Sequence, residues 1–183
     1  WTFEKFPDTD PHLTTRMKSV GEAMSIGRTF KEALQKALRS LEIGRFGLGC
    51  DRKDAAMNGT LPSIDEIRRQ LARPTDERIF HVRYALKAGM SAGEIHELTG
   101  IDPWFLDNLA EIFEFEGDLA KLGSLDALDD ATLREAKRTG YADEQLARLL
   151  GARQQDVRAR RKRAGIEPVY KLVDTCAAEF EAY

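Results

Sequence analysis

Two stretches of this sequence repeat each other at a constant spacing. Residues 82–106 align with residues 133–157 without a gap, at an offset of 51 positions. The matched positions are Gly89 with Gly140, Gly100 with Gly151, Ile95 with Leu146, Leu98 with Leu149, and Leu106 with Val157. Glycine at such positions adopts the left-handed conformation that ends a helix and turns the chain. The spacing therefore predicts one unit twice: a helix ending at glycine, a two-turn helix ending at glycine, and a departing third helix.

Helix-starting signals occur along most of the chain. Ser, Thr and Asp accept hydrogen bonds from the first free backbone N–H groups of a helix, and Pro fits its first position. The predicted starts are Thr29, Ser63, Thr75, Ser91, Asp102 before Pro103, Asp130, Asp143 and Gln154. The sequence thus predicts an all-α fold, an orthogonal helical bundle built from two repeated helix-Gly-helix-Gly-helix units, with extended segments at the two ends.

Other segments lack the helical period. In residues 19–27, apolar residues and Glu22 alternate with small residues, which predicts a strand whose small face admits a close backbone neighbour. We expect Glu22 to form a buried hydrogen bond there. Residues 1–6 are predicted to be a second extended segment, with further sheet partners upstream, because two strands alone are unstable. Residues 44–60, glycine-rich and aperiodic, are predicted to be a linker.

Composition fits an ordinary globular protein of one or two domains, with 42% hydrophobic and 32% charged residues and a net charge of −3. No apolar run is long enough to span a membrane, and no signal peptide is recognisable. The scattered histidines, His12, His81 and His96, do not have metal-ligand spacing, and Cys50 and Cys176 are expected to be reduced thiols. We find no nucleotide-binding loop and no set of residues that would make an active site.

The second repeat copy allows two interpretations. Residues 146–165 have the spacing of a helix-turn-helix, which makes DNA binding the alternative hypothesis. We favour a packing module, because the same unit in the first copy continues with apolar residues 103–106 that cannot read base edges. Residues 102–135 hold ten acidic and two basic residues, which could pair with the basic helix inside the molecule. The aromatic residues of the first copy are expected to lie in the core: Trp104, Phe105, Phe113 and Phe115.

The segment LTTRMKSVGEAMSIGRTFKEALQKALRSLE, residues 13–42, closely resembles the large subunit of carbamoyl-phosphate synthetase where its first ATP-grasp half ends. PVYKLVDTCAAEF, residues 168–180, resembles the segment that leads toward the second half. The resemblance implies that residues 1–41 are the C-terminal tail of the carboxyphosphate-forming component. It implies that residues 42–183 are the helical oligomerisation domain.

The resemblance also implies a function. The family is a cytoplasmic ligase that makes carbamoyl phosphate from bicarbonate, ATP and ammonia, for arginine and pyrimidine biosynthesis, and a glutaminase small subunit releases the ammonia from glutamine. ATP and Mg²⁺ or Mn²⁺ would bind the parent enzyme outside this segment, so no catalytic residue is transferred and no cofactor is expected here. The implied partners are the two ATP-grasp components, the small subunit and a further copy of the chain, with no nucleic acid and no membrane.

Two groups of residues are the resulting candidate sites. The apolar stripe Ile64, Ile67 and Leu71 on the predicted helix of residues 63–72 is the candidate oligomer interface; alternatively, this stripe only covers the local core. The resemblance places Met17 and Val20 near the internal ammonia passage of the family.

Overall fold

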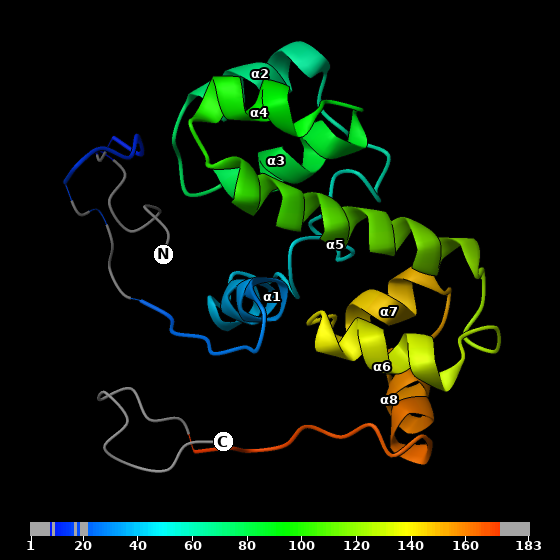
Figure 1. Cartoon of the computed structure of the whole chain (residues 1–183). Coiled ribbons are helices and arrows are strands. Elements are labelled where there is room, and N and C mark those ends of the chain that lie inside the picture. The colour runs from blue at the N-terminus through cyan, green and yellow to red at the C-terminus, as the bar shows by residue number, and fades with distance from the viewer. Residues whose placement is uncertain (1–7, 9, 17, 19–21, 173–183) are drawn as a thin grey trace.

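The computed structural model describes residues 8, 10–16, 18 and 22–172. Within these residues the regular structure is entirely helical, as predicted. The helices are α1 (Phe30–Ser40), α2 (Ile64–Ala72), α3 (Arg78–Lys87), α4 (Ala92–Thr99), α5 (Pro103–Lys121), α6 (Asp130–Arg138), α7 (Asp143–Leu149) and α8 (Gln154–Arg163). The long helix α5 crosses the middle of the molecule, with α2, α3 and α4 on one side and α1, α6, α7 and α8 on the other (Figure 1).

The helix bounds follow the sequence repeat. The first copy is α3–α4–α5 and the second is α6–α7–α8, and the last two helices of each copy begin 51 positions apart. All four glycines of the repeat have positive φ: Gly89, Gly100, Gly140 and Gly151. After the first glycine of each copy, the same backbone hydrogen bond closes the turn, from Met90 N to Ala85 O and from Tyr141 N to Ala136 O, each at 3.0 Å.

Most of the predicted helix starts are confirmed. Ser91 and Glu94 form a reciprocal capping box, and Asp102 caps α5 with Pro103 in its first turn. Thr29 and Ser63 cap α1 and α2 by accepting from the backbone N–H of Glu32 and of Glu66. The predicted start at Thr75 is early, because α3 begins at Arg78 after a turn.

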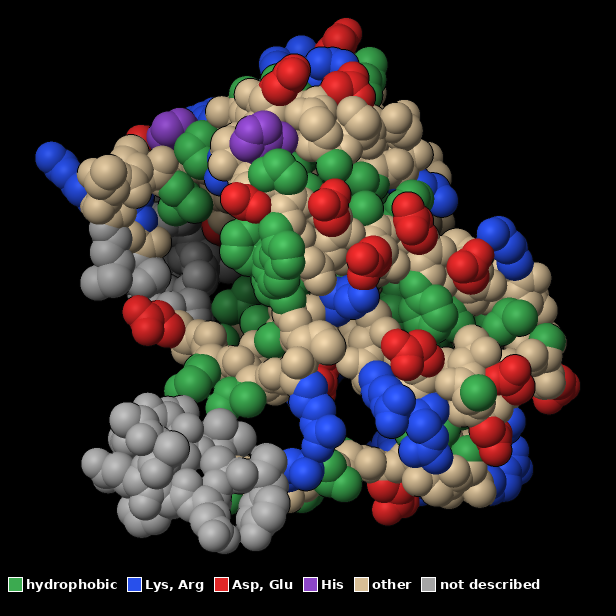
Figure 2. All heavy atoms as spheres, in the orientation of Figure 1, with side chains coloured by type: hydrophobic (Ala, Val, Ile, Leu, Met, Phe, Trp, Pro, Cys, Tyr) green, Lys and Arg blue, Asp and Glu red, His purple; other side chains and the backbone are tan. Residues whose placement is uncertain are grey.

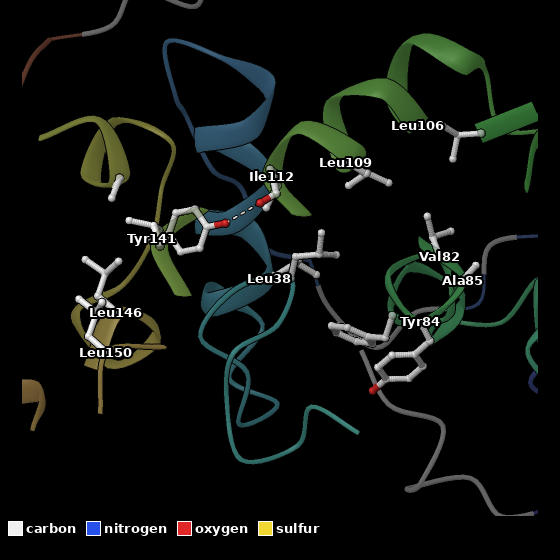
Figure 3. Packing of buried hydrophobic residues seen from close by; sticks show 14 of the residues in the cluster. Leu38, Val82, Tyr84, Ala85, Leu106, Leu109, Ile112, Tyr141, Leu146 and Leu150 are labelled. Carbon is white, nitrogen blue, oxygen red and sulfur yellow. Dashed lines mark hydrogen bonds between the residues drawn. The ribbon is translucent and has the colours of Figure 1, made fainter. Parts of the chain in front are cut away.

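The two copies share one apolar core. Ile95 and Leu146 are each fully buried, and Tyr141 lies between the copies, where its hydroxyl donates to the carbonyl of Ile112 at 2.7 Å (Figure 3). Leu38 of α1 packs into the same cluster. The core therefore holds α1 and both copies together as one packed unit.

The predicted strand over residues 19–27 is wrong for residues 22–27, which have no regular structure and form no strand pairing within the described chain. Glu22 is exposed, so its predicted buried hydrogen bond is also wrong. The prediction of a close backbone neighbour at the small face is confirmed. Ser25 Oγ donates to the carbonyl of Ala33 at 2.7 Å, and a Cβ at Gly27 would lie 2.6 Å from the nitrogen of Ala33.

Candidate functional site

Residues 44–60 form an ordered loop that enters the centre of the molecule, and we name it the central loop. Leu48 and Cys50 are buried, and the backbone N–H of Cys50 donates to Asp54 at 2.8 Å. The prediction of a linker is therefore wrong. Buried backbone groups need hydrogen-bond partners, and here side chains of the loop and of the helices supply them.

Arg83 is the centre of a buried ionic cluster. Its guanidinium donates to Asp54 at 2.7 and 3.1 Å and to Glu116 at 2.5 and 2.7 Å. Burial opposes the charge on Arg83, but the hydrogen bonds and charge of Glu116 outweigh burial, and the pKa of Arg83 rises above its ordinary value. The cluster ties α3 and α5 to the central loop and leaves no room beside the arginine, because a Cβ at Gly49 would overlap its guanidinium.

Burial also decides the chemistry of the neighbouring thiol. Cys50 is fully buried, and burial together with the nearby charge of Glu116 raises the pKa of its thiol well above the ordinary value. A buried, protonated thiol is a poor nucleophile. Cys50 is therefore a structural residue.

A second buried group joins α1 to the second repeat copy. The amide of Gln145 donates to Gln35 at 3.1 Å and to the carbonyl of Gly49 at 2.9 Å, and Gln35 donates to the carbonyl of Thr139 at 3.2 Å. The backbone N–H of Leu48 completes the group by donating to Gln35 at 3.4 Å. We call this group and the Arg83 cluster together the polar junction: Gln35, Asp54, Arg83, Glu116 and Gln145.

The polar junction is not predicted from the sequence, although two features of the sequence are related to it. Arg83 is a charged residue within the mostly apolar stretch of residues 79–86 in α3, and Gly47 and Gly49 lie close together in the chain. A Cβ at Gly47 would overlap the amides of Gln35 and Gln145, so both glycines are required by close packing. Because its polar groups bond to one another in the interior, the junction stabilises the fold and offers no exposed group for chemistry.

The predicted oligomer interface on α2 divides into two parts. Ile67 and Leu71 are fully buried in the core of this chain. Ile64 is 41% exposed, and Met57 and Leu61 before it are also exposed. The part of the stripe that a partner can reach is therefore Ile64 and its preceding residues. The two residues predicted near an ammonia passage, Met17 and Val20, lie outside the described residues.

The prediction that the aromatic residues of α5 lie in the core is wrong for two of them. Trp104 is 55% exposed and Phe105 is 42% exposed, whereas Phe113 and Phe115 are half-buried. Both exposed rings pack against Phe30 at the start of α1, with ring centroids 5.4 and 5.3 Å away. Leu106 directs its side chain into the core instead, because it lies one helical position further round.

The basic helix α8 is anchored by acidic neighbours. Val157 is buried, Arg161 binds Asp143 at 2.9 Å and Arg160 binds Asp130 at 2.5 Å. Of these acids only Asp130 lies in the acidic stretch 102–135, so the predicted pairing with that stretch holds for one ion pair. These two ion pairs hold Arg160 and Arg161 against the rest of the molecule, and nothing in the described structure supports the DNA-binding alternative.

Two of the histidines, His81 and His96, contact neighbouring residues of the fold. His96 Nδ1 lies 2.7 Å from the carbonyl oxygen of Ile101, and the His81 ring packs edge-on against Tyr84. Burial lowers the pKa of His81, so its ring is neutral at pH 7. Among the described residues, no three His, Cys, Asp or Glu side chains are grouped so that they could hold a metal ion. No helix of this part is long and apolar enough to cross a membrane.

Comparisons with known proteins give the family. The chain is 57% identical over 183 residues to the carbamoyl phosphate synthase large chain of Rhodopirellula baltica, of which it covers 17%. It is 54% identical over 183 residues to that of a Synechocystis strain, of which it covers 16%. All of this chain is covered in both, so it spans about a sixth of the length of these relatives.

One relative consists of only the N-terminal section of a carbamoyl phosphate synthase large chain, and we refer to it as the split relative. The chain is 48% identical over 193 aligned residues to a protein of Methanopyrus kandleri described as the N-terminal section of the carbamoyl phosphate synthase large chain, of which 33% is covered. Residues 22–165 match the family model described as the carbamoyl-phosphate synthetase large chain, oligomerisation domain. Because this match covers most of the chain, the chain belongs to the family of carbamoyl-phosphate synthetase large-chain oligomerisation domains.

Proposed function

We propose that this chain is the noncatalytic scaffold that links and assembles the synthetic components of a carbamoyl-phosphate synthetase large subunit. In this proposal, residues 1–41 are the tail of the carboxyphosphate-forming component and residues 42–183 are the oligomerisation domain. The main support for this proposal is the polar junction, which lies within residues 22–165, the range that matches the family model. Gln35, on the proposed tail, bonds to Gln145 and to the carbonyl of Thr139, which makes the connection between the two parts rigid.

The parent enzyme would make carbamoyl phosphate from bicarbonate, ATP and ammonia for arginine and pyrimidine biosynthesis in the cytoplasm. The ammonia would come from glutamine through a glutaminase small subunit and would pass near Met17 and Val20. ATP and Mg²⁺ or Mn²⁺ would bind the two ATP-grasp components. The role of this chain is to hold those components in a fixed relation.

Self-association would use the exposed end of α2. Most homo-oligomers close by two-fold symmetry, so that an apolar patch meets its own copy. Ile64 is accessible for such a contact, and its exposed neighbours Met57 and Leu61 enlarge the apolar area. Ile67 and Leu71 would support Ile64 from the core beneath it.

Sedimentation velocity of the complete large subunit tests this interface. Ile64→Glu places a charge in the centre of the contact and is expected to raise the dissociation constant of the oligomer about tenfold or more. Ala159→Glu on α8, another exposed helical position, is the matched control and should leave the oligomer unchanged. An unaltered oligomer in Ile64→Glu would rule out this interface.

A further inference from the structure

Two exposed aromatic rings, Trp104 and Phe105, form a cluster with the half-buried ring of Phe30 that the fold itself does not explain. We name Phe30, Trp104 and Phe105 the aromatic patch. Each ring packs against the other two, with the Trp104 and Phe105 centroids 5.0 Å apart and their planes at 85°. Figure 2 shows hydrophobic surface gathered over the start of α5 beside α1. The rings therefore hold one another in place while keeping a large apolar face in water.

The second repeat copy shows that the fold does not need aromatic residues here. At the offset of 51, Gln155 and Asp156 stand where the first copy has Trp104 and Phe105. These polar residues begin α8 in the same local structure and suit an exposed position. Large aromatic residues are enriched where one surface binds another, and a contiguous exposed apolar patch marks an interaction site.

The mainly acidic charges along α5 disfavour contact of the aromatic patch with its own copy. Asp102, Asp107 and Glu114 are exposed along α5, and Glu111, also exposed, pairs with Lys31. Acidic side chains line the helix beside the apolar surface in Figure 2. In a two-fold contact this acidic rim would face itself, which is unfavourable. The matching surface is instead an apolar one with a basic rim.

The position of the aromatic patch indicates which part of the parent protein covers it. Phe30 follows an extended segment in which Met24 is 82% exposed and Ile26 is also exposed, so the apolar surface continues toward the N-terminal side of the chain. Further upstream, the backbone N–H of Leu13 donates to the carbonyl of Pro74 at 2.7 Å, beside α2 and α3. In the split relative of Methanopyrus kandleri, the matching region is part of the N-terminal section.

We propose that the aromatic patch docks onto the part of the same polypeptide that precedes residue 1 in the longer parent subunit. The inference rests on the proposed function, in which this chain is one segment of that subunit. The docked surface offers an apolar depression for Trp104 and Phe105, with Lys or Arg side chains facing Asp102 and Asp107. The contact fixes the orientation of the scaffold relative to the upstream component.

Photocrosslinking in the complete large subunit tests the proposal. A photoreactive p-benzoylphenylalanine is placed at position 104, and the protein is assembled from a mixture of ¹⁴N-labelled and ¹⁵N-labelled chains. We expect crosslinks that join position 104 to sequence upstream of residue 1. Both peptides of each crosslink should carry the same nitrogen isotope, which shows that they come from one chain. Mixed-isotope crosslinks, crosslinks downstream of residue 183 or to the small subunit, or no crosslink at all would overturn the proposal. Intrachain crosslinks form without an oligomer. The crosslinking result can therefore be interpreted even if the proposed self-association does not occur.

Hydrogen exchange of the same subunit gives an independent readout. The double variant Trp104→Ser with Phe105→Ser is expected to speed amide exchange about tenfold in the segment upstream of residue 1 that crosslinks to position 104, because the contact that covers this segment is lost. Gln155→Ser at the matched position of the second copy is the control and leaves exchange unchanged. The amide of Ile95 reports whether the domain is still folded. Unchanged exchange in that upstream segment of the double variant, with Ile95 protected, would contradict the docking.

Discussion

In the first copy of the repeat, α3 carries Arg83 into the polar junction, whereas in the second copy the matched Arg134 on α6 lies in solvent. The glycines that follow these helices also differ: the one in the second copy is closely packed and the one in the first copy is not. No atom lies within 4 Å of a Cβ built at Gly89, while a Cβ at Gly140 would lie 3.0 Å from the Cβ of Gln35 and 3.1 Å from the Cα of Glu32. The first copy thus anchors the central loop, and the second receives α1 against its backbone.

Positions of the repeat that are buried in both copies and polar positions that are buried in only one copy have separate roles. Shared apolar and glycine positions, such as Ile95 with Leu146, fix the local fold of each copy. Polar positions that are buried in only one copy determine what that copy binds: Arg83 is buried whereas its match Arg134 is exposed, and Gln145 is buried whereas its match Glu94 is exposed. One supersecondary unit therefore serves two different packing roles in the same chain.

The largest predicted effect separates the two arginines. Arg83→Met leaves Asp54 and Glu116 buried without their cation, and is expected to lower the free energy of unfolding by about 3–5 kcal/mol. Arg134→Met changes only an exposed side chain and should cost less than about 0.5 kcal/mol. Urea denaturation followed by circular dichroism measures both. Equal effects of the two substitutions would show that the buried cluster does not stabilise the fold.

An intermediate effect separates the two glycines. Gly89→Ala suffers only the strain of a positive φ and is expected to cost about 1 kcal/mol. Gly140→Ala suffers that strain and also pushes α1 away, for a total of about 3 kcal/mol. Thermal unfolding of the two variants compares them. A cost at Gly140 no larger than that at Gly89 would mean that α1 does not pack there in solution.

The smallest effect concerns Asp143, whose matched residue in the first copy is Ala92. Burial raises the pKa of Asp143, but hydrogen bonds and charges from Lys137 and Arg161 outweigh burial and leave it below the ordinary value. The unfolded chain then binds a proton more readily than the folded one, so this stabilisation is complete above about pH 4 and is lost as the pH falls further.

Asp143→Asn should therefore cost about 1 kcal/mol at pH 7 and less as the pH falls below about 4. Urea denaturation at a series of pH values measures the difference from the unmodified chain. Asp156→Asn, which alters an exposed pair with Arg153, is the control and should change stability little at any pH. A cost of Asp143→Asn that grows toward low pH would contradict the assigned sign.

Local signals were enough to predict the helices. Capping residues such as Ser91 and Asp102 act on the nearest backbone groups, and glycines such as Gly140 end helices by their own φ, so both leave a readable pattern. The repeat and the all-α class followed from the same signals. The burial of Ile67 and Leu71 was within reach too, because their spacing matched a core face as well as an interface.

Features that depend on distant partners were not predictable from one sequence. The central loop looked like a linker because Arg83 and Gln145, which hold it, lie 33 and 96 positions away from the residues they contact. The sequence predicts Trp104 and Phe105 as core residues because both are hydrophobic. Hydrophobicity alone does not show whether such a residue packs inside its own domain or against a separate surface. Residues 22–27 alternate as a strand would, but a strand also needs a paired backbone.

Native-state hydrogen exchange tests most directly whether the central loop folds as one unit with both repeat copies. The amide of Cys50, which donates to Asp54, is compared with those of Ile95 and Leu146, which lie in the two copies. If the loop is pinned by the polar junction, all three amides exchange with the same free energy, that of global unfolding. Exchange of the Cys50 amide that is several orders of magnitude faster, with the other two protected, would show that the loop is a linker after all.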